Sequence, residues 1–184
     1  DDYGVTQNGV SQLPKNETFG LAFTFALSPN PDYGDMFIGG RDGNNDLFVR
    51  TRDEIGSLGG VDLRLSDSAN GEIEVATDNA YDDNSVYVAI INKTGNTESD
   101  IDIYVGQSKS ELVNPEPTSV MGKSGFSHTD YTYATDVDMG FWNDIIDGTV
   151  FSEFIDADMG LIEANTEIYS EQERKEIIDR RPEL

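Results

Sequence analysis

The sequence contains no cysteine, a single histidine and few basic residues. Without cysteine, disulfide bridges and thiolate metal sites are excluded. The 12 Lys and Arg residues are scattered, so a nucleic acid partner is not expected. No run of about 18 apolar residues occurs, which predicts that no transmembrane helix is present. The chain opens on Asp1 and Asp2 without the basic and apolar regions of a signal peptide, which predicts a protein that is either not secreted or already processed.

Acidic residues, by contrast, are abundant. Asp and Glu total 36 against 12 Lys and Arg, which gives a net charge of −24. In dilute solution such a surface repels itself, whereas molar salt shortens the Debye length to about 3 Å and screens most of the repulsion. The acids are interleaved with aromatic residues that can form a core, which argues against a disordered chain. We therefore interpret the acidity as the adaptation of a folded protein to strong salt.

Alternation of apolar and polar residues predicts strands along most of the chain. Large apolar residues fall on every odd position of 19–27, which predicts a strand with one deeply buried face. The apolar run 86–91 predicts a central strand, and 101–105 is its expected hairpin partner. Further strands are expected at 36–38, 47–51, 61–65, 72–76 and 161–169, with a Gly-rich connection at 39–46 and a long loop at 106–127.

The pattern as a whole predicts an all-β fold. About eight strands with many turn signals are typical of an antiparallel single jelly roll or β-sandwich. Ser170 and Glu173 have the spacing of a capping box, so a short C-terminal helix is expected from about Glu171 to Asp179. The predicted organisation is an extended N-terminal arm at 1–18, a β-sandwich domain at 19–169, and a C-terminal helix and tail at 170–184.

No catalytic signature is present, and we expect neither enzymatic activity nor a cofactor. His128 has Ser127 and Asp130 beside it, but adjacent residues of a strand point to opposite faces, so Ser127 and His128 cannot pair there. The glycines at 39–43 are not followed by the Lys of a phosphate-binding loop, so we interpret them as turn residues.

Two Asp-x-Asp-Met-Gly stretches are the candidates for structural cations. Each could place two carboxylate oxygens, the ligands that Ca²⁺ prefers, on one side of an extended segment: Asp136 and Asp138 in the first, and Asp156 and Asp158 in the second. Neither has the full spacing of an EF-hand loop, and a solvated loop is the alternative interpretation. Asn16 and Asn92 each begin an Asn-x-Thr tripeptide, the acceptor pattern for N-glycosylation.

The alternating strand 19–27, the central run 86–91, its partner 101–105 and the acidity together resemble a known family. This family is the small major capsid proteins of the icosahedral, internal-membrane viruses of haloarchaea. The resemblance covers the whole chain in pattern and size and rests on no short motif. It implies a single jelly roll in the virion that assembles with copies of itself and with a second, larger jelly-roll capsid protein, near an internal membrane. It implies no catalytic residues.

Two other functions fit the sequence. Residues 86–96 resemble the strand and Asn-rich turn of secreted haloarchaeal filament or surface-layer proteins, whose sandwich accepts a neighbour's N-terminal strand. The arm at 1–18 would be the donor, and the location would be extracellular or the cell surface. The third function is that of a carbohydrate-binding sandwich. It would need exposed aromatic residues beside acids, which could be Tyr131, Tyr133, Phe141 and Trp142.

Overall fold

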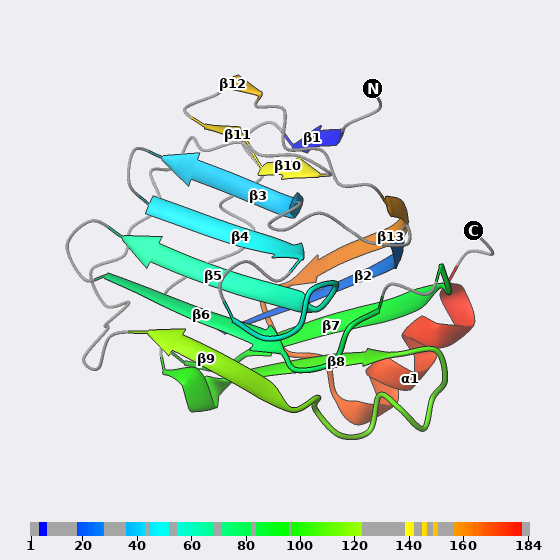
Figure 1. Cartoon of the computed structure of the whole chain (residues 1–184). Coiled ribbons are helices and arrows are strands. Elements are labelled where there is room, and N and C mark those ends of the chain that lie inside the picture. The colour runs from blue at the N-terminus through cyan, green and yellow to red at the C-terminus, as the bar shows by residue number, and fades with distance from the viewer. Residues whose placement is uncertain are drawn as a thin grey trace.

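The described part of the chain has two stacked β-sheets, one C-terminal α-helix and a short 3-10 helix (Glu98–Asp100) (Figure 1). The computed structural model describes residues 4–6, 18–27, 36–42, 45–51, 55–67, 71–81, 84–95, 97–122, 139–141, 145–146, 149–150 and 157–181. These residues confirm the predicted all-β sandwich. No helix among them is long and apolar enough to cross a membrane.

The larger sheet has nine strands within these residues. Its order is β1 (Gly4–Thr6), β10 (Met139–Phe141), β3 (Met36–Asp42), β4 (Asn45–Thr51), β5 (Val61–Asp67), β6 (Gly71–Thr77) and β9 (Thr118–Gly122). In addition, β11 (Ile145–Ile146) pairs with β3, and β12 (Thr149–Val150) pairs with β11. The smaller sheet runs β13 (Ala157–Asn165), β2 (Phe19–Leu27), β7 (Tyr87–Lys93) and β8 (Ile101–Gly106). Neighbouring strands are antiparallel, except that β11 meets β3 in parallel.

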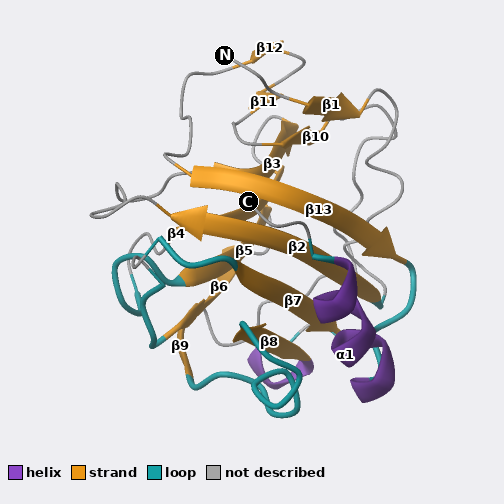
Figure 2. Ribbon diagram, turned by 90° about the vertical axis from the view of Figure 1, so that its right-hand side faces the viewer, coloured by secondary structure: helices purple, strands orange, loops and turns teal. Residues whose placement is uncertain are grey.

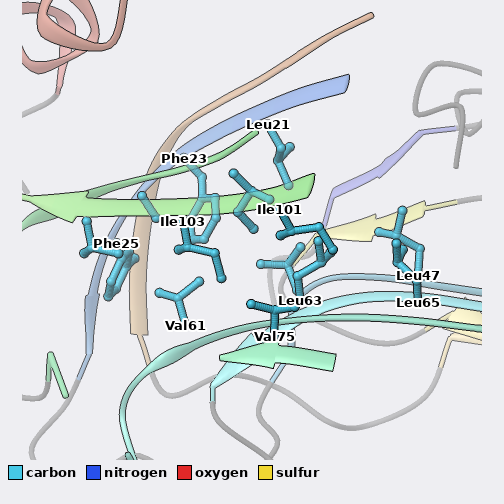
Figure 3. Packing of buried hydrophobic residues seen from close by; sticks show 14 of the residues in the cluster. Leu21, Phe23, Phe25, Leu47, Val61, Leu63, Leu65, Val75, Ile101 and Ile103 are labelled. Carbon is cyan, nitrogen blue, oxygen red and sulfur yellow. The ribbon is translucent and has the colours of Figure 1, made fainter. Parts of the chain in front are cut away.

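The core lies between the two sheets and is built from alternate residues of their strands (Figure 3). From β2 it takes the large residues of the odd positions, and Phe23 and Phe25 are completely buried. Aliphatic side chains of the larger sheet face them, among them Leu47, Val49, Val61, Leu63 and Val75. The period of two that predicted β2 therefore reflects the burial of one of its faces between the sheets.

The other face of the smaller sheet is covered by helix α1 (Glu171–Arg180) and the segment that leads into it (Figure 2). Ile177 from the helix and Tyr169 before it belong to one buried cluster with Ala22 of β2 and with Val88 and Ile90 of β7. A Cβ atom at Gly20 would lie 2.7 Å from the carbonyl oxygen of Glu167 and 2.7 Å from the Tyr169 ring. The small residues at the even positions of β2 therefore allow this close approach.

The structure confirms the C-terminal helix that the capping box predicted. The Ser170 hydroxyl accepts a hydrogen bond from the backbone N–H of Glu173, and the Glu173 carboxylate accepts one from the backbone N–H of Ser170 at 2.8 Å. The helix extends from Glu171 to Arg180, one residue beyond the expected end.

Three strand boundaries differ from the predictions. Strands β3 and β4 continue through most of 39–46, where a long connection was expected, because Gly39 and Gly40 pair with Phe48 and Leu47. Strand β9 lies within 106–127, which was predicted to be a loop. It pairs with β6 alone in the described sheet, and such an edge strand needs no strongly apolar pattern. The last strand is Ala157–Asn165 rather than 161–169, since the chain turns toward α1 after Asn165.

The N-terminal arm is in part a strand. Residues 4–6 form β1, which pairs with β10 at one end of the larger sheet. The other residues of 1–17 lie outside the described part. The strand count also exceeds the expected eight, since short strands such as β1, β10, β11 and β12 carry little apolar pattern of their own.

Candidate functional site

Polar side chains from three connections meet at one end of the sandwich. They are Ser57 from the β4–β5 connection, Asp78 and Asn79 after β6, and Glu116 and Ser119 around the start of β9; we call them the polar corner. The Ser119 hydroxyl donates to Asp78 Oδ1 at 2.6 Å, and the Asn79 amide donates to the Glu116 carboxylate. Asp78 and Asn79 are exposed, so these groups can be reached from solvent.

Backbone hydrogen bonds hold the three connections together. The N–H of Asp78 donates to the carbonyl of Pro117 at 2.9 Å, and the N–H of Ser57 donates to that of Thr77 at 3.3 Å. Gly56 adopts a φ of 72°, and a Cβ there would lie only 2.5 Å from the Thr77 carbonyl oxygen. Glycine is therefore required for the β4–β5 connection to approach the end of β6.

Tyr81 lies buried close to the corner, and Leu58 is exposed next to Ser57. Tyr81 is only 7% exposed and packs edge-on against Tyr87 at 5.0 Å between ring centroids. Its hydroxyl is buried without a hydrogen-bond partner in the described structure. Burial raises the pKa of this phenol well above its usual range, and the nearby Glu116 carboxylate raises it further. Leu58, 44% exposed, adds an apolar surface.

The polar corner has the chemistry of a site for a ligand rich in hydroxyl groups. Carboxylates accept hydrogen bonds, an amide both donates and accepts, and hydroxyls do either. A few such groups beside an apolar surface are typical of small-molecule sites. The Tyr81 hydroxyl is buried and lies near Glu116, so it is not among the groups that a ligand can reach.

A second group of charged residues lies on the larger sheet, on the face opposite the core. It consists of Arg50 on β4, Asp62 and Arg64 on β5, and Glu72 and Glu74 on β6; we call it the charged ladder. Arg50 Nε lies 3.0 Å from Asp62 Oδ2, and Arg50 Nη2 lies 3.4 Å from Glu74 Oε2. Arg64 Nη2 lies 2.6 Å from Glu72 Oε2. The ladder therefore ties three neighbouring strands together by ion pairs.

Burial differs along the ladder. The side chains of Asp62 and Glu74 are completely buried, and that of Arg50 is 7% exposed, whereas Arg64 and Glu72 are partly exposed. Burial raises the pKa of the Asp62 carboxyl well above its usual range; Arg50 opposes the rise, and Glu74 adds to it. The buried end is thus inaccessible to a large ligand, and we assign it no binding role.

Most of the site residues predicted from the sequence lie outside the described structure. This holds for Asp136, Asp138, Asp156, Asn16 and also for His128. Asp158 is in β13, where its backbone pairs with Ala26, but its side chain is not described. Within the described ranges, no group of three or more His, Cys, Asp or Glu side chains could hold a metal ion. The structural cations therefore stay a prediction.

Asn92 has a structural role in the folded chain. Asn92 is only 3% exposed. Its amide nitrogen donates a hydrogen bond to the Tyr169 carbonyl at 2.8 Å, and its side-chain oxygen accepts one from the Tyr169 N–H at 2.9 Å. A glycan would occupy the amide nitrogen that makes the first of these bonds. The geometry therefore disfavours glycosylation of Asn92 once the chain has folded.

Lys93, next to Asn92 at the end of β7, is a buried cation. The residue has no exposed surface, and its ammonium group lies 5.7 Å from the centre of the Phe19 ring. Burial lowers the pKa of the Lys93 amine to about 8, against the opposing effect of Asp100. The protonated amine therefore destabilises the folded state relative to the unfolded chain.

This placement predicts a rise of stability in mild alkali. Below pH 8 the penalty for the buried charge is fully present, and it is removed between the folded pKa of about 8 and the ordinary value of 10.5. We expect the free energy of unfolding to rise by about 2 kcal/mol between about pH 7.5 and 9.5, and Lys93→Met to remove this rise. Urea titrations in molar salt measure it. Equal slopes in the two proteins would contradict the assignment.

The comparisons with known proteins concern the fold. No protein-family model matches the sequence, and no curated protein matches it. Among solved structures, the chain is similar to a structure of botulinum neurotoxin type C, whose cell entry is described as dependent upon interaction with two ganglioside molecules. The TM-score is 0.63 at 11% identity, and the match covers 97% of this chain. The binding domain of botulinum neurotoxin DC in complex with rat synaptotagmin II gives a TM-score of 0.63 at 12% identity over the same share.

A heptameric pentraxin from Limulus polyphemus is also similar. Its TM-score is 0.53 at 11% identity, and the match covers 96% of this chain and 82% of the pentraxin chain. The chain spans only about 40% of the length of the toxin domains that it matches. At these identities the likeness shows the fold alone, which places the chain in the class of jelly-roll-like β-sandwiches.

Proposed function

We propose that this chain is a non-catalytic recognition module that binds carbohydrate at the polar corner. The observation that carries the proposal is the meeting of Asp78, Asn79 and Glu116 beside the exposed Leu58. Sugar hydroxyls can pair with the remaining hydrogen-bonding capacity of these carboxylates and of the amide, and the apolar face of a sugar ring fits an aliphatic surface. The fold supports the proposal, since one similar toxin domain is described as interacting with gangliosides.

A glycan array probed at molar salt tests the proposal. We expect the protein to bind a subset of glycans, with affinity reduced about tenfold or more by Asn79→Ala and by Glu116→Gln, because each removes a hydrogen-bonding group. Asp179→Asn is the matched control: it removes an exposed carboxylate that accepts a hydrogen bond from Lys109 and lies on the C-terminal helix rather than at the corner. Binding that is unchanged in both corner variants, or no glycan bound at all, would overturn the proposal.

Assembly with copies of itself is the second candidate function. The likeness to a pentraxin described as heptameric favours it, since that sandwich of similar length forms a multi-subunit particle. The capsid role, with a second jelly-roll capsid protein as partner, and the strand-exchange filament are particular forms of this candidate and stay predictions. Electron microscopy of the protein in molar salt separates the candidates: capsids or filaments favour assembly, whereas single particles that bind a glycan favour recognition.

A further inference from the structure

The side chains of the polar corner use most of their hydrogen-bond donors among themselves. The Ser57 hydroxyl donates to the Asp78 carbonyl, and the Ser119 hydroxyl donates to Asp78 Oδ1 at 2.6 Å. The Asn79 amide donates to Glu116 Oε2. The second N–H of this amide is therefore the one side-chain donor that these contacts leave to a ligand.

Acceptors, in contrast, remain at the corner. Within the described ranges, Asp78 Oδ2 and the side-chain oxygen of Asn79 accept no hydrogen bond. Glu116 accepts from Asn79 and lies near the Tyr81 hydroxyl, but a carboxylate has about four acceptor positions and keeps part of this capacity. Neither Asp78 nor Glu116 forms an ion pair with a Lys or Arg that the structure describes.

The two carboxylates border the same amide. Asn79 follows Asp78 directly in the chain, and its side chain donates to Glu116. Asp78 is exposed and Glu116 is partly exposed, so a ligand can reach both. The corner therefore offers a ligand mainly acceptors, together with negative charge that no described cation balances.

This balance restricts the ligands that fit. A carboxylate or sulfate group of a sugar would contact like charges, which costs binding free energy. A hydroxyl group donates one hydrogen bond, whereas an ammonium group donates three, and hydrogen bonds between charged partners are the stronger ones. In molar salt the Debye length of about 3 Å is close to a hydrogen-bond distance, so salt weakens such a contact without removing it.

We infer that the polar corner selects sugars with a free amino group, binds neutral sugars more weakly and rejects sugars that carry carboxylate or sulfate groups. The inference rests on the proposed carbohydrate site and names the class of sugar that it takes. The carboxylates of Asp78 and Glu116 accept hydrogen bonds from the ammonium group. The exposed Leu58 contacts the apolar face of the sugar ring.

Three oligosaccharides of equal length test the selectivity: a glucosamine oligomer, an N-acetylglucosamine oligomer and a uronic acid oligomer. Isothermal titration calorimetry is done in molar salt at about pH 5.5, where ordinary carboxylates are ionised and amines are protonated. We expect the Kd of the glucosamine oligomer to be about tenfold or more below that of the N-acetylglucosamine oligomer, and the uronic acid oligomer to bind most weakly.

Two results would overturn the selectivity and leave the carbohydrate site standing. The first is a uronic acid oligomer that binds as tightly as the glucosamine oligomer, or equal binding of the glucosamine and N-acetylglucosamine oligomers. The second is that none of the three binds although the glycan array detects other sugars. An array without any bound glycan would instead overturn the proposed site, and the selectivity with it.

Variants separate the corner from the acidic surface as a whole, since a cationic oligomer also meets acids elsewhere on a chain of net charge −24. Asp78→Asn and Glu116→Gln each remove one carboxylate at nearly constant shape. Each should weaken binding of the glucosamine oligomer about tenfold or more and that of the N-acetylglucosamine oligomer by a smaller factor. Glu116→Gln decides alone if Asp78→Asn fails to fold.

Asp179→Asn again serves as the control, because it removes the same charge from the C-terminal helix. It should leave the affinities for both oligomers unchanged. If Asp179→Asn weakens binding of the glucosamine oligomer as much as the corner variants do, the oligomer binds the acidic surface without a defined site, and the inference is overturned.

Discussion

Replacing Arg174 by Met should lower the free energy of unfolding by about 3–5 kcal/mol. Arg174 lies on α1, is 7% exposed, and donates hydrogen bonds to three backbone carbonyls: those of Leu112 and Tyr169 at 2.9 Å each, and that of Val113 at 3.2 Å. Its guanidinium carbon also lies 3.9 Å from the centre of the Tyr104 ring. The side chain therefore links the helix to the connection after β8 and to the smaller sheet.

The expected loss of stability in Arg174→Met comes mainly from backbone carbonyls that lose a hydrogen-bond donor. Met fills much of the same volume, but three carbonyls lose their charged donor. The Tyr169 carbonyl keeps the hydrogen bond from Asn92, so the cost falls on the carbonyls of Leu112 and Val113, because a buried acceptor without a partner costs about 1–3 kcal/mol. The cation–π contact with Tyr104 is lost as well. Arg174→Lys should recover only part of the loss, because a single ammonium group cannot reach three acceptors with the fork geometry of a guanidinium.

Urea unfolding at molar salt, together with amide hydrogen exchange of α1, measures this effect. Lys175→Met is the matched control, since Lys175 is the next residue of the helix and forms an ion pair with Glu171 near the surface. Such a pair contributes about 0.3–0.5 kcal/mol. If Arg174→Met is no more destabilised than Lys175→Met, the helix is held by apolar contacts such as that of Ile177 rather than by Arg174.

The sandwich could be predicted from sequence wherever one face of a strand is buried in the core. Strand β2 begins and ends at the predicted residues, because Phe19, Phe23 and Leu27 alternate with small residues and all enter the core. The predictions of a β7–β8 hairpin and of the capped helix α1 were also confirmed. In each case a local pattern carries the information, so no knowledge of distant partners is needed.

The errors fall where a distant partner decides the structure. The backbone of Gly39 and Gly40 becomes strand because β4 offers hydrogen bonds, although glycine weakens a strand. Val120 lies in β9 because it pairs with Val75 of β6, despite two prolines shortly before it. Neither pairing is visible in the residues of the segment itself.

For the candidate sites, too, local patterns could be predicted from sequence, whereas features that depend on distant residues could not. Strict alternation in 61–65 and 72–76 already places the charged residues of the ladder on the face opposite the core, so that face could be predicted. Their burial could not, because alternation usually marks the polar face as solvated. The polar corner joins residues as distant in sequence as Ser57 and Ser119, and no spacing rule brings them together.

Dilution from molar to millimolar salt should abolish most of the secondary structure seen by circular dichroism. The net charge is −24, because 36 Asp and Glu face only 12 Lys and Arg. At 1 M salt the Debye length is about 3 Å, so charges on neighbouring residues scarcely interact; at 0.01 M it is about 30 Å, and charges across the whole surface repel one another. The compact state concentrates that charge and is therefore destabilised relative to the unfolded chain.

Salt also strengthens the burial of apolar surface, and the pH dependence separates this cause from screening. If repulsion is the cause, lowering the pH toward the pI of about 4.1 at millimolar salt should restore structure, because protonation removes the charges that salt would screen. If weakened apolar burial is the cause, acid should restore nothing, while a strongly salting-out anion such as sulfate should outperform chloride at equal ionic strength. An unchanged spectrum after dialysis to millimolar salt at neutral pH would refute the interpretation that the protein needs strong salt. The stabilisation from the sandwich core would then exceed the repulsion of the acidic surface even where salt does not screen it.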